Sequence, residues 1–196
     1  WAMFDDDEWG APQVPIIAEA LTMLGIPVVG AEGAEADDII GSLARLWDGP
    51  VDIVTGDRDL FQLVDDDRST RVLYTARGVG NHDVVDAAWI RGKYAIEPSQ
   101  YVDFAVMRGD ASDGLPGVPG IGEKTAASLL ATYGDLDGIE AAADDPSSDL
   151  RPRIRQSLLD SRDYIQKART VVAVREDVAT VDAVVPLAPL TSDVSE

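Results

Sequence analysis

The chain has 196 residues and no cysteine, and its 36 acidic residues outnumber 16 basic ones, giving a formal net charge of −20. The lack of cysteine excludes disulfide scaffolds, cysteine zinc sites and thiol catalysis, and the acidic charge disfavours direct binding of a polyanion unless a cation bridges the two. No apolar run approaches the roughly 20 residues of a membrane span and no signal-peptide pattern opens the sequence, so we expect a cytoplasmic protein with no membrane partner.

The first 85 residues alternate between helix-like and strand-like segments. Apolar residues at a spacing of three to four indicate helices, and short apolar runs bounded by Gly or Asp indicate buried strands. Such alternation with short connections is typical of a parallel α/β sheet with right-handed crossovers. The expected helices are at residues 14–24, 35–44 and 57–63, and the expected strands are at 26–29, 51–55 and 70–75.

Beyond residue 85 the pattern becomes helical. A stretch dense in Gly and Pro, residues 109–122, interrupts it and predicts a set of tight turns. From residue 176 the chain reads as a partly extended tail. The expected helices are at about 84–95, 98–107, 123–133, 135–143, 149–159 and 160–170.

Acidic residues follow two of the expected strands. Glu35, Asp37 and Asp38 come after the first, and Asp57 and Asp59 come after the second. Because the carboxyl ends of parallel strands share one sheet edge, we expect these carboxylates to converge there. Mg²⁺ and Mn²⁺ prefer oxygen ligands, whereas converging carboxylates without a cation repel one another. Acids also favour helix N-termini, so their spacing alone leaves a structural explanation open.

A glycine-rich hairpin precedes the helix expected at residues 123–133. Between Gly117 and Gly122 it exposes successive backbone N–H groups that are suited to hold a phosphate, with Lys124 in the first turn of the helix. The alternative is a tight turn that needs glycine only for positive φ. Just upstream, Asp110 and Asp113 fit turn-forming residues on spacing alone.

Three blocks of sequence are more specific than any single motif. They are E-A-D-D-I-I-G at residues 35–41, V-T-G-D-R-D-L-F-Q-L at residues 54–63, and G-D-A-S-D-G-L-P-G-V-P-G-I-G-E-K-T-A at residues 109–126. In order and separation these blocks resemble the bacterial 5′-3′ exonuclease and flap endonuclease family, which includes the N-terminal nuclease domain of many bacterial type I DNA polymerases. The resemblance covers about residues 14–175.

The resemblance implies an α/β fold with two parts. A PIN-like, parallel-sheet nuclease core is expected over residues 1–85, followed by an α-helical, helix-three-turn-helix DNA-binding module over residues 86–175 and a C-terminal tail over residues 176–196. Family members begin with a metal-binding strand and a basic helical arch. No segment before Glu35 matches those parts, so we expect the N-terminal part of the core to be missing.

The resemblance also assigns roles to individual residues. The implied divalent-metal ligands are Glu35, Asp37, Asp38, Asp57, Asp59, Asp110 and Asp113. Among these, the implied catalytic residues are Asp37, Asp57, Asp59 and Asp110. The implied DNA-binding residues are Gly117, Gly120, Gly122, Lys124 and Thr125, in a hairpin that in relatives can also hold K⁺.

The activity that the resemblance implies is structure-specific hydrolysis of DNA phosphodiesters in replication and repair. A monomer with two Mg²⁺ or Mn²⁺ ions would act on branched or 5′-ended duplex DNA, working alongside a DNA polymerase and a ligase. The missing segment leaves a second hypothesis, a truncated and catalytically weak remnant that binds duplex DNA. A third, a PIN-like ribonuclease, shares the acidic core but gives no reason for the hairpin.

Overall fold

The computed structural model describes residues 13–111 and 113–178. These residues divide into two compact units, one made of residues 13–45 and 175–178 and the other of residues 46–174. The predicted domain boundary at residue 85 lies inside the second unit and stays a prediction. Within the described ranges, no helix combines the length and the apolar character that a membrane crossing requires.

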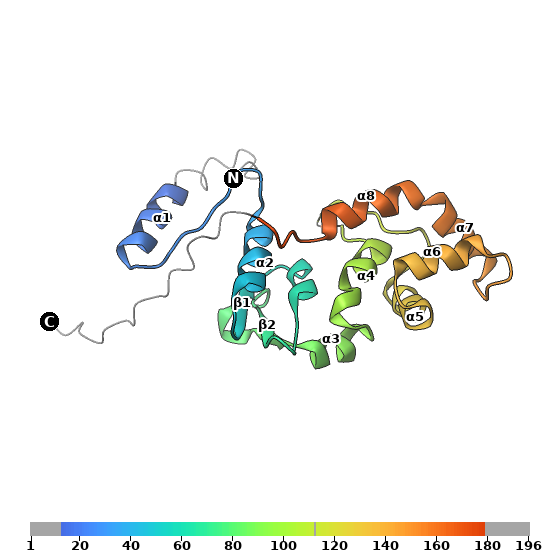
Figure 1. The fold of residues 1–196 in the computed structure, drawn as a ribbon, viewed down its shortest axis with the longest axis horizontal. Coiled ribbons are helices and arrows are strands. Elements are labelled where there is room, and N and C mark those ends of the chain that lie inside the picture. Colours follow the sequence, from blue (N-terminus) through green and yellow to red (C-terminus); the bar gives the residue numbers. More distant parts are fainter. Residues whose placement is uncertain (1–12, 112, 179–196) are drawn as a thin grey trace. The chain divides into compact units, whose positions relative to one another are not determined.

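The first unit contains both helices that were predicted there. They are α1 (Gln13–Met23) and α2 (Ala36–Leu46), both labelled in Figure 1. Helix α1 buries none of its side chains, whereas α2 buries Ile39. The strand predicted at residues 26–29 is wrong, because these residues form no ladder. Pro27 has no N–H group to donate to a neighbouring strand.

The second unit is built on a three-stranded sheet in the order β1-β2-β3. β1 (Val51–Thr55) and β2 (Thr70–Tyr74) confirm two predicted strands and their parallel pairing. β3 (Asp83–Val85) pairs antiparallel with β2 and lies where a helix was expected to begin. The sheet is therefore mixed, and its parallel part is limited to β1 and β2.

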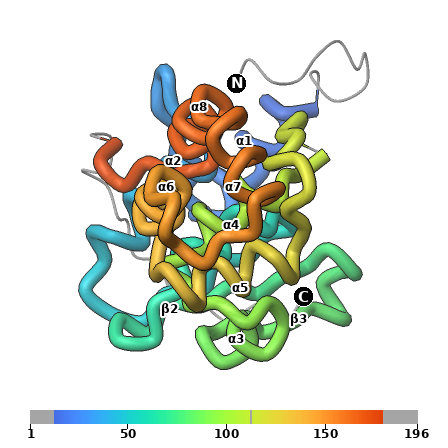
Figure 2. The backbone as a smooth tube through the Cα atoms, turned by 90° about the vertical axis from the view of Figure 1, so that its right-hand side faces the viewer, coloured from blue at the N-terminus to red at the C-terminus, as the bar shows by residue number. Residues whose placement is uncertain are grey.

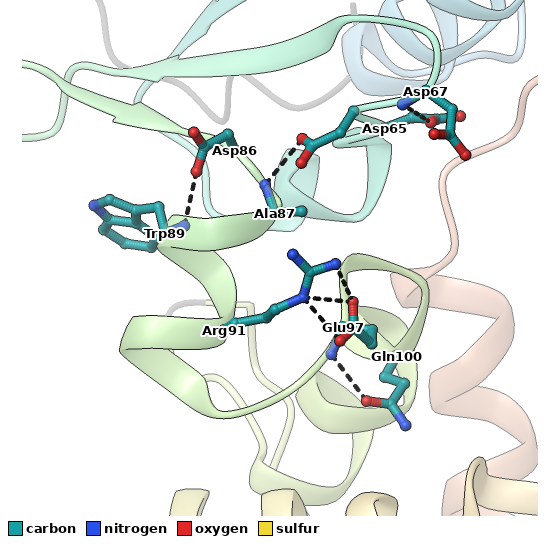
Figure 3. A network of polar contacts seen from close by, with 9 residues as sticks. Asp65, Asp67, Asp86, Ala87, Trp89, Arg91, Glu97 and Gln100 are labelled. Carbon is teal, nitrogen blue, oxygen red and sulfur yellow. Dashed lines mark hydrogen bonds and ion pairs between the residues drawn. The ribbon is translucent and has the colours of Figure 1, made fainter.

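The late start of α3 (Ala87–Tyr94) has a local cause. Asp86 is extended and caps the helix, since its Oδ1 accepts a hydrogen bond of 2.7 Å from the Trp89 N–H (Figure 3). The residues before Asp86 are thereby left free to join the sheet. At the other end of α3, Arg91 binds the carboxylate of Glu97, with its Nη2 2.7 Å from Oε2.

The remaining helices confirm the predicted helical region, with shifts of at most three residues at their ends and none for α5. The segment expected at 98–107 opens as a short 3₁₀ helix, and α7 starts later than expected, with proline at a favourable first position. The helices are α4 (Tyr101–Arg108), α5 (Glu123–Tyr133), α6 (Leu136–Asp144), α7 (Pro152–Asp160) and α8 (Arg162–Val172). The 3₁₀ helices are η1 (Asp59–Leu63), η2 (Val79–Asn81) and η3 (Pro98–Gln100).

Helix α4 forms the centre of the second unit. It packs against η1, α5 and α8 (Figure 2), and it buries Phe104, Val106 and Met107 completely. Aromatic rings continue this core toward the sheet, and Phe61 makes edge-to-face contacts with Tyr74 and other rings. The loop after β1 and the loop after α4 are thus fixed to one shared core.

Asp103 is a buried carboxylate on α4. Its Oδ2 accepts a hydrogen bond of 2.9 Å from the Leu136 N–H, and its Oδ1 lies 3.5 Å from Nε of Arg169. Burial raises the pKa of Asp103 above its ordinary value, against the lowering effects of Leu136 and Arg169. The folded chain therefore holds this proton to a higher pH than the unfolded chain does.

Asp103→Asn is expected to change how stability depends on pH. In the wild type, the free energy of unfolding falls as pH rises from about 4, the ordinary pKa of an aspartate, through the raised pKa of Asp103. The asparagine oxygen can still accept from Leu136, and Arg169 keeps Asp137 as a partner. The variant should therefore gain stability relative to the wild type as pH rises through this interval. Urea unfolding at a series of pH values tests this, and a difference that is constant with pH would contradict it.

Candidate active site

The loop between β1 and η1 places two of the predicted acids. The Asp57 N–H donates to Oγ1 of Thr55, and Oδ1 of Asp57 accepts from the Asp59 N–H, both at 2.9 Å. These local bonds turn the chain sharply at the end of the parallel strand. Asp57 is exposed and Asp59 is half-buried, so both carboxylates lie at the carboxyl edge of the sheet, where the sequence predicted them.

Asp110 lies beside this loop, held by two arginines. Its Oδ2 is 2.7 Å from Nη2 of Arg58 and 3.2 Å from Nη2 of Arg108, and its side chain is 7% exposed. The Arg108 guanidinium also stacks over the Phe104 ring, 5.2 Å from the centroid. A buried carboxylate needs this opposite charge, because desolvation without it is costly.

Asp113 lies on the turn that follows Asp110. Two backbone hydrogen bonds between Asp110 and Leu115, of 2.8 and 3.0 Å, close this turn. Partial burial raises the pKa of the Asp113 carboxyl, and the negative charges of Asp110 and Asp57 raise it further, against Arg58 and Arg108. Two of the predicted ligands, Asp57 and Asp110, therefore act electrostatically on a third, Asp113, within the second unit.

The three other predicted ligands belong to the first unit. Asp38 accepts from the N–H groups of Glu35 and Arg175, at 3.2 and 2.9 Å, and Asp37 lies with it in the first turn of α2. Glu35 itself is exposed. The predicted convergence of these acids depended on a strand at residues 26–29, and those residues form no strand.

A preformed cluster of metal ligands is absent from the part of the chain that the structure describes. Over residues 13–111 and 113–178, no three acidic or histidine side chains come together in a group that would hold an ion. The chemistry of the donors still fits a hard divalent cation, because all of them are carboxylates. Like charges oppose the closer approach of these carboxylates unless positive charge is supplied.

The hairpin from Gly117 to Gly122 is anchored to the core by two buried side chains and by Tyr164. Val118 and Ile121 are each 3% exposed, and the Ile121 N–H donates to the Val118 carbonyl at 2.9 Å. Tyr164 on α8 ties the start of the hairpin to α4, because its hydroxyl accepts from the Gly117 N–H and donates to the Val106 carbonyl, both at 3.0 Å. The turn is therefore held rigidly while its tip stays accessible.

The tip of the hairpin has the features of a phosphate site. Gly120 and Gly122 are exposed, and no acceptor within the described ranges bonds to their N–H groups. They directly precede the N-terminus of α5, which is the positive end of the helix dipole. Lys124 is exposed in the first turn without an ionic partner among the described residues, and Thr125 is half-buried.

Arg58, Arg108 and Tyr164 are parts of this site that the sequence analysis did not assign. Arg58 lies between two predicted ligands, and Arg108 lies two residues before a third, so their position next to the acids was the available signal. No sequence signal marked Tyr164, which lies 47 residues from the glycine that it contacts.

Two family models together match nearly the whole chain. Residues 7–95 match the 5′-3′ exonuclease N-terminal resolvase-like domain, and residues 96–191 match the 5′-3′ exonuclease C-terminal SAM fold. The predicted fold class, an α/β core followed by a helical module, is confirmed.

Individual relatives agree with these models. A 5′-3′ exonuclease of Streptomyces coelicolor is 56% identical over 172 residues, which are 88% of this chain and 57% of that protein. DNA polymerase I of Mycobacterium bovis is 42% identical over 168 residues, which are 82% of this chain and 18% of the polymerase. The chain thus spans little more than half the length of the stand-alone relative.

A solved structure shares the fold. The bacteriophage T5 flap endonuclease, in a complex with DNA and metal ions, superposes with a TM-score of 0.64 at 19% sequence identity. The match covers 79% of this chain and 55% of the phage protein. At this identity the likeness shows the arrangement of the elements and no more.

Proposed function

We propose that this chain, which belongs to the bacterial 5′-3′ exonuclease family, is a divalent-metal-dependent, structure-specific 5′ nuclease that hydrolyses DNA phosphodiesters at flaps, nicks and 5′ ends. One observation carries the proposal. Arg58, which lies between Asp57 and Asp59 at the carboxyl edge of the sheet, binds Oδ2 of Asp110 at 2.7 Å and so joins the acids of two of the family's motif blocks.

The proposed metal ligands are the seven acids Glu35, Asp37, Asp38, Asp57, Asp59, Asp110 and Asp113, with Asp37, Asp57, Asp59 and Asp110 as the catalytic subset. Bound Mg²⁺ or Mn²⁺, proposed at two positions, would polarise the scissile phosphate and make a water more acidic. The carboxylates would hold the ions and balance their charge. Arg58 and Arg108 fix the orientation of Asp110 through their ion pairs.

We assign duplex binding to the hairpin and the start of α5. The free N–H groups of Gly120 and Gly122 and the side chains of Lys124 and Thr125 would hold one strand by its phosphates. Gly117 would support this binding by starting the turn, since its own N–H is bonded to Tyr164. Backbone carbonyls of the same hairpin are the proposed site of a K⁺ ion. These contacts read no bases, so they suit an enzyme that recognises the structure of its substrate.

The proposed partners follow from the substrate. Branched or 5′-ended duplex DNA is expected to bind a monomer of this chain. The similarity to DNA polymerase I supports action beside a polymerase, and nicked products would pass to a ligase.

A second candidate is a DNA-binding protein with little or no nuclease activity. It is favoured by the lack of a three-residue metal group within residues 13–111 and 113–178. In that case the hairpin would still bind duplex DNA in a salt-dependent way.

Cleavage of a 5′-labelled double-flap DNA by the full chain, with Mg²⁺, Mn²⁺ or EDTA, separates the candidates. We expect release of the flap with either metal and none with EDTA. Binding without release under every condition would overturn the proposed activity and support the second candidate. Preference for single-stranded RNA over the flap DNA would overturn both and support a ribonuclease.

A further inference from the structure

A groove of about 700 Å³ lies between the end of β2 and α3, within the second unit. This volume falls within the range of about 300–1,000 Å³ that is usual for ligand pockets. Three of its lining residues are cationic and three are aromatic. The lining residues are Arg58, Tyr74, Ala76, Arg77, Asp83, Trp89, Gly92, Lys93 and Tyr94.

The charge of this groove is opposite to that of the whole chain. Arg58, Arg77 and Lys93 face one acid, Asp83, on a protein whose net charge is −20. Arg77 pairs with Asp83 at 2.5 Å, whereas Lys93 is exposed and has no ionic partner among the described residues. The groove therefore keeps a net positive charge suited to an anionic ligand.

The aromatic rings give the groove an apolar wall. Trp89 and Tyr74 are both partly exposed, and both pack edge-to-face against Phe61, with ring centroids 5.6 and 5.0 Å apart. Figure 3 shows the Trp89 indole pointing away from Arg91 of α3 and from its partner Glu97, which caps η3. The rings are thus held in place by the core while part of their surface stays accessible.

Arg58 connects the groove to the acidic site. Its guanidinium lines the groove and also binds Oδ2 of Asp110 at 2.7 Å. A polymer whose phosphate lies at the acidic site can therefore continue past Arg58 toward Lys93. A cationic groove with stacking rings is the usual way of binding unpaired nucleic acid, because unpaired bases can stack on the rings while the backbone meets the cations.

We propose that this groove binds the unpaired strand of a DNA substrate next to the cleaved phosphate. Lys93 and Arg77 contact its phosphates, and Trp89 and Tyr74 stack its bases. The inference rests on the proposed function in taking DNA as the substrate, and it adds a binding site outside the acidic cluster and outside the hairpin.

Binding by the full chain to two DNAs at fixed salt tests the inference. One DNA is a duplex with a 5′ flap of ten thymidines, and the other is the same duplex without the flap. Lys93→Gln is expected to weaken binding of the flap DNA roughly 3- to 10-fold, to reduce the salt slope by about 0.7, and to leave the flapless duplex unchanged. Arg91→Gln is the matched control, because Arg91 lies two residues away on α3 and is already paired with Glu97.

A second readout does not depend on the charge. Adding the thymidine oligonucleotide should quench part of the tryptophan fluorescence of the wild type, and Trp89→Phe should remove that part. Two results would overturn the proposed role of the groove while leaving the proposed function intact. One is that Lys93→Gln weakens binding of both DNAs equally, and the other is that neither substitution changes binding of the flap DNA. A wild-type chain that binds and cleaves neither DNA would overturn both.

Discussion

Alanine at Gly117 is expected to lower the free energy of unfolding by about 2–5 kcal/mol. Gly117 has a φ of 71°, where a residue with a Cβ pays roughly 1–2 kcal/mol. Its Cβ would also lie 2.6 Å from the Arg108 carbonyl oxygen, a backbone atom that cannot rotate away. Overpacking of this kind costs about 1–3 kcal/mol more. Urea unfolding measures the sum.

Gly120 provides the matched control for this prediction. Its φ is 81°, but a Cβ there would meet nothing within 4 Å. Gly120→Ala should therefore carry only the conformational cost, about 1–2 kcal/mol. Equal losses in the two variants would show that the chain around Gly117 relaxes, and that the close approach to Arg108 contributes nothing to stability.

Local patterns in the sequence were sufficient for most of the helices and for the β1–β2 pair. Their periodicity and boundary residues are encoded within a few positions, as in α5 between Gly122 and Gly134. β3 was missed because a strand of three residues is too short to show an alternating pattern, and the helical pattern that follows it extends over more residues. The segment 26–29 shows the opposite error, since an apolar run predicted a strand although Pro27 lacks a donor.

The candidate site was predictable in its residue types and only partly in its geometry. The resemblance indicated Asp57, Asp110 and Asp113 from their motif blocks, and in the structure the charges of Asp57 and Asp110 act on Asp113. The pairing of Arg58 with Asp110 spans 52 residues, a distance over which spacing predicts no contact. Long-range ion pairs follow from the packing of η1 on α4, which a single sequence does not specify.

Asp57→Asn is expected to reduce metal-dependent cleavage of the 5′-flap DNA about 10²-fold or more. Asp57 is exposed, and its Oδ1 accepts from the Asp59 N–H, a bond that the asparagine oxygen preserves. The substitution therefore removes one negative charge while keeping the loop. Losing roughly 3 kcal/mol of charge stabilisation in the transition state corresponds to this change in rate. Single-turnover cleavage with Mg²⁺ and with Mn²⁺ measures it.

Asp52→Asn is the control, because Asp52 lies on β1 five residues earlier and forms a surface ion pair with Arg71 at 2.6 Å. An exposed pair contributes about 1 kcal/mol or less to stability, so this variant should cleave at the wild-type rate. Unchanged cleavage by Asp57→Asn would remove Asp57 from the active site. A similar loss of rate in both variants would mean that the rate follows the total surface charge, because each substitution removes one negative charge. A loss confined to Asp57→Asn ties the reaction to the sheet edge where β1 ends.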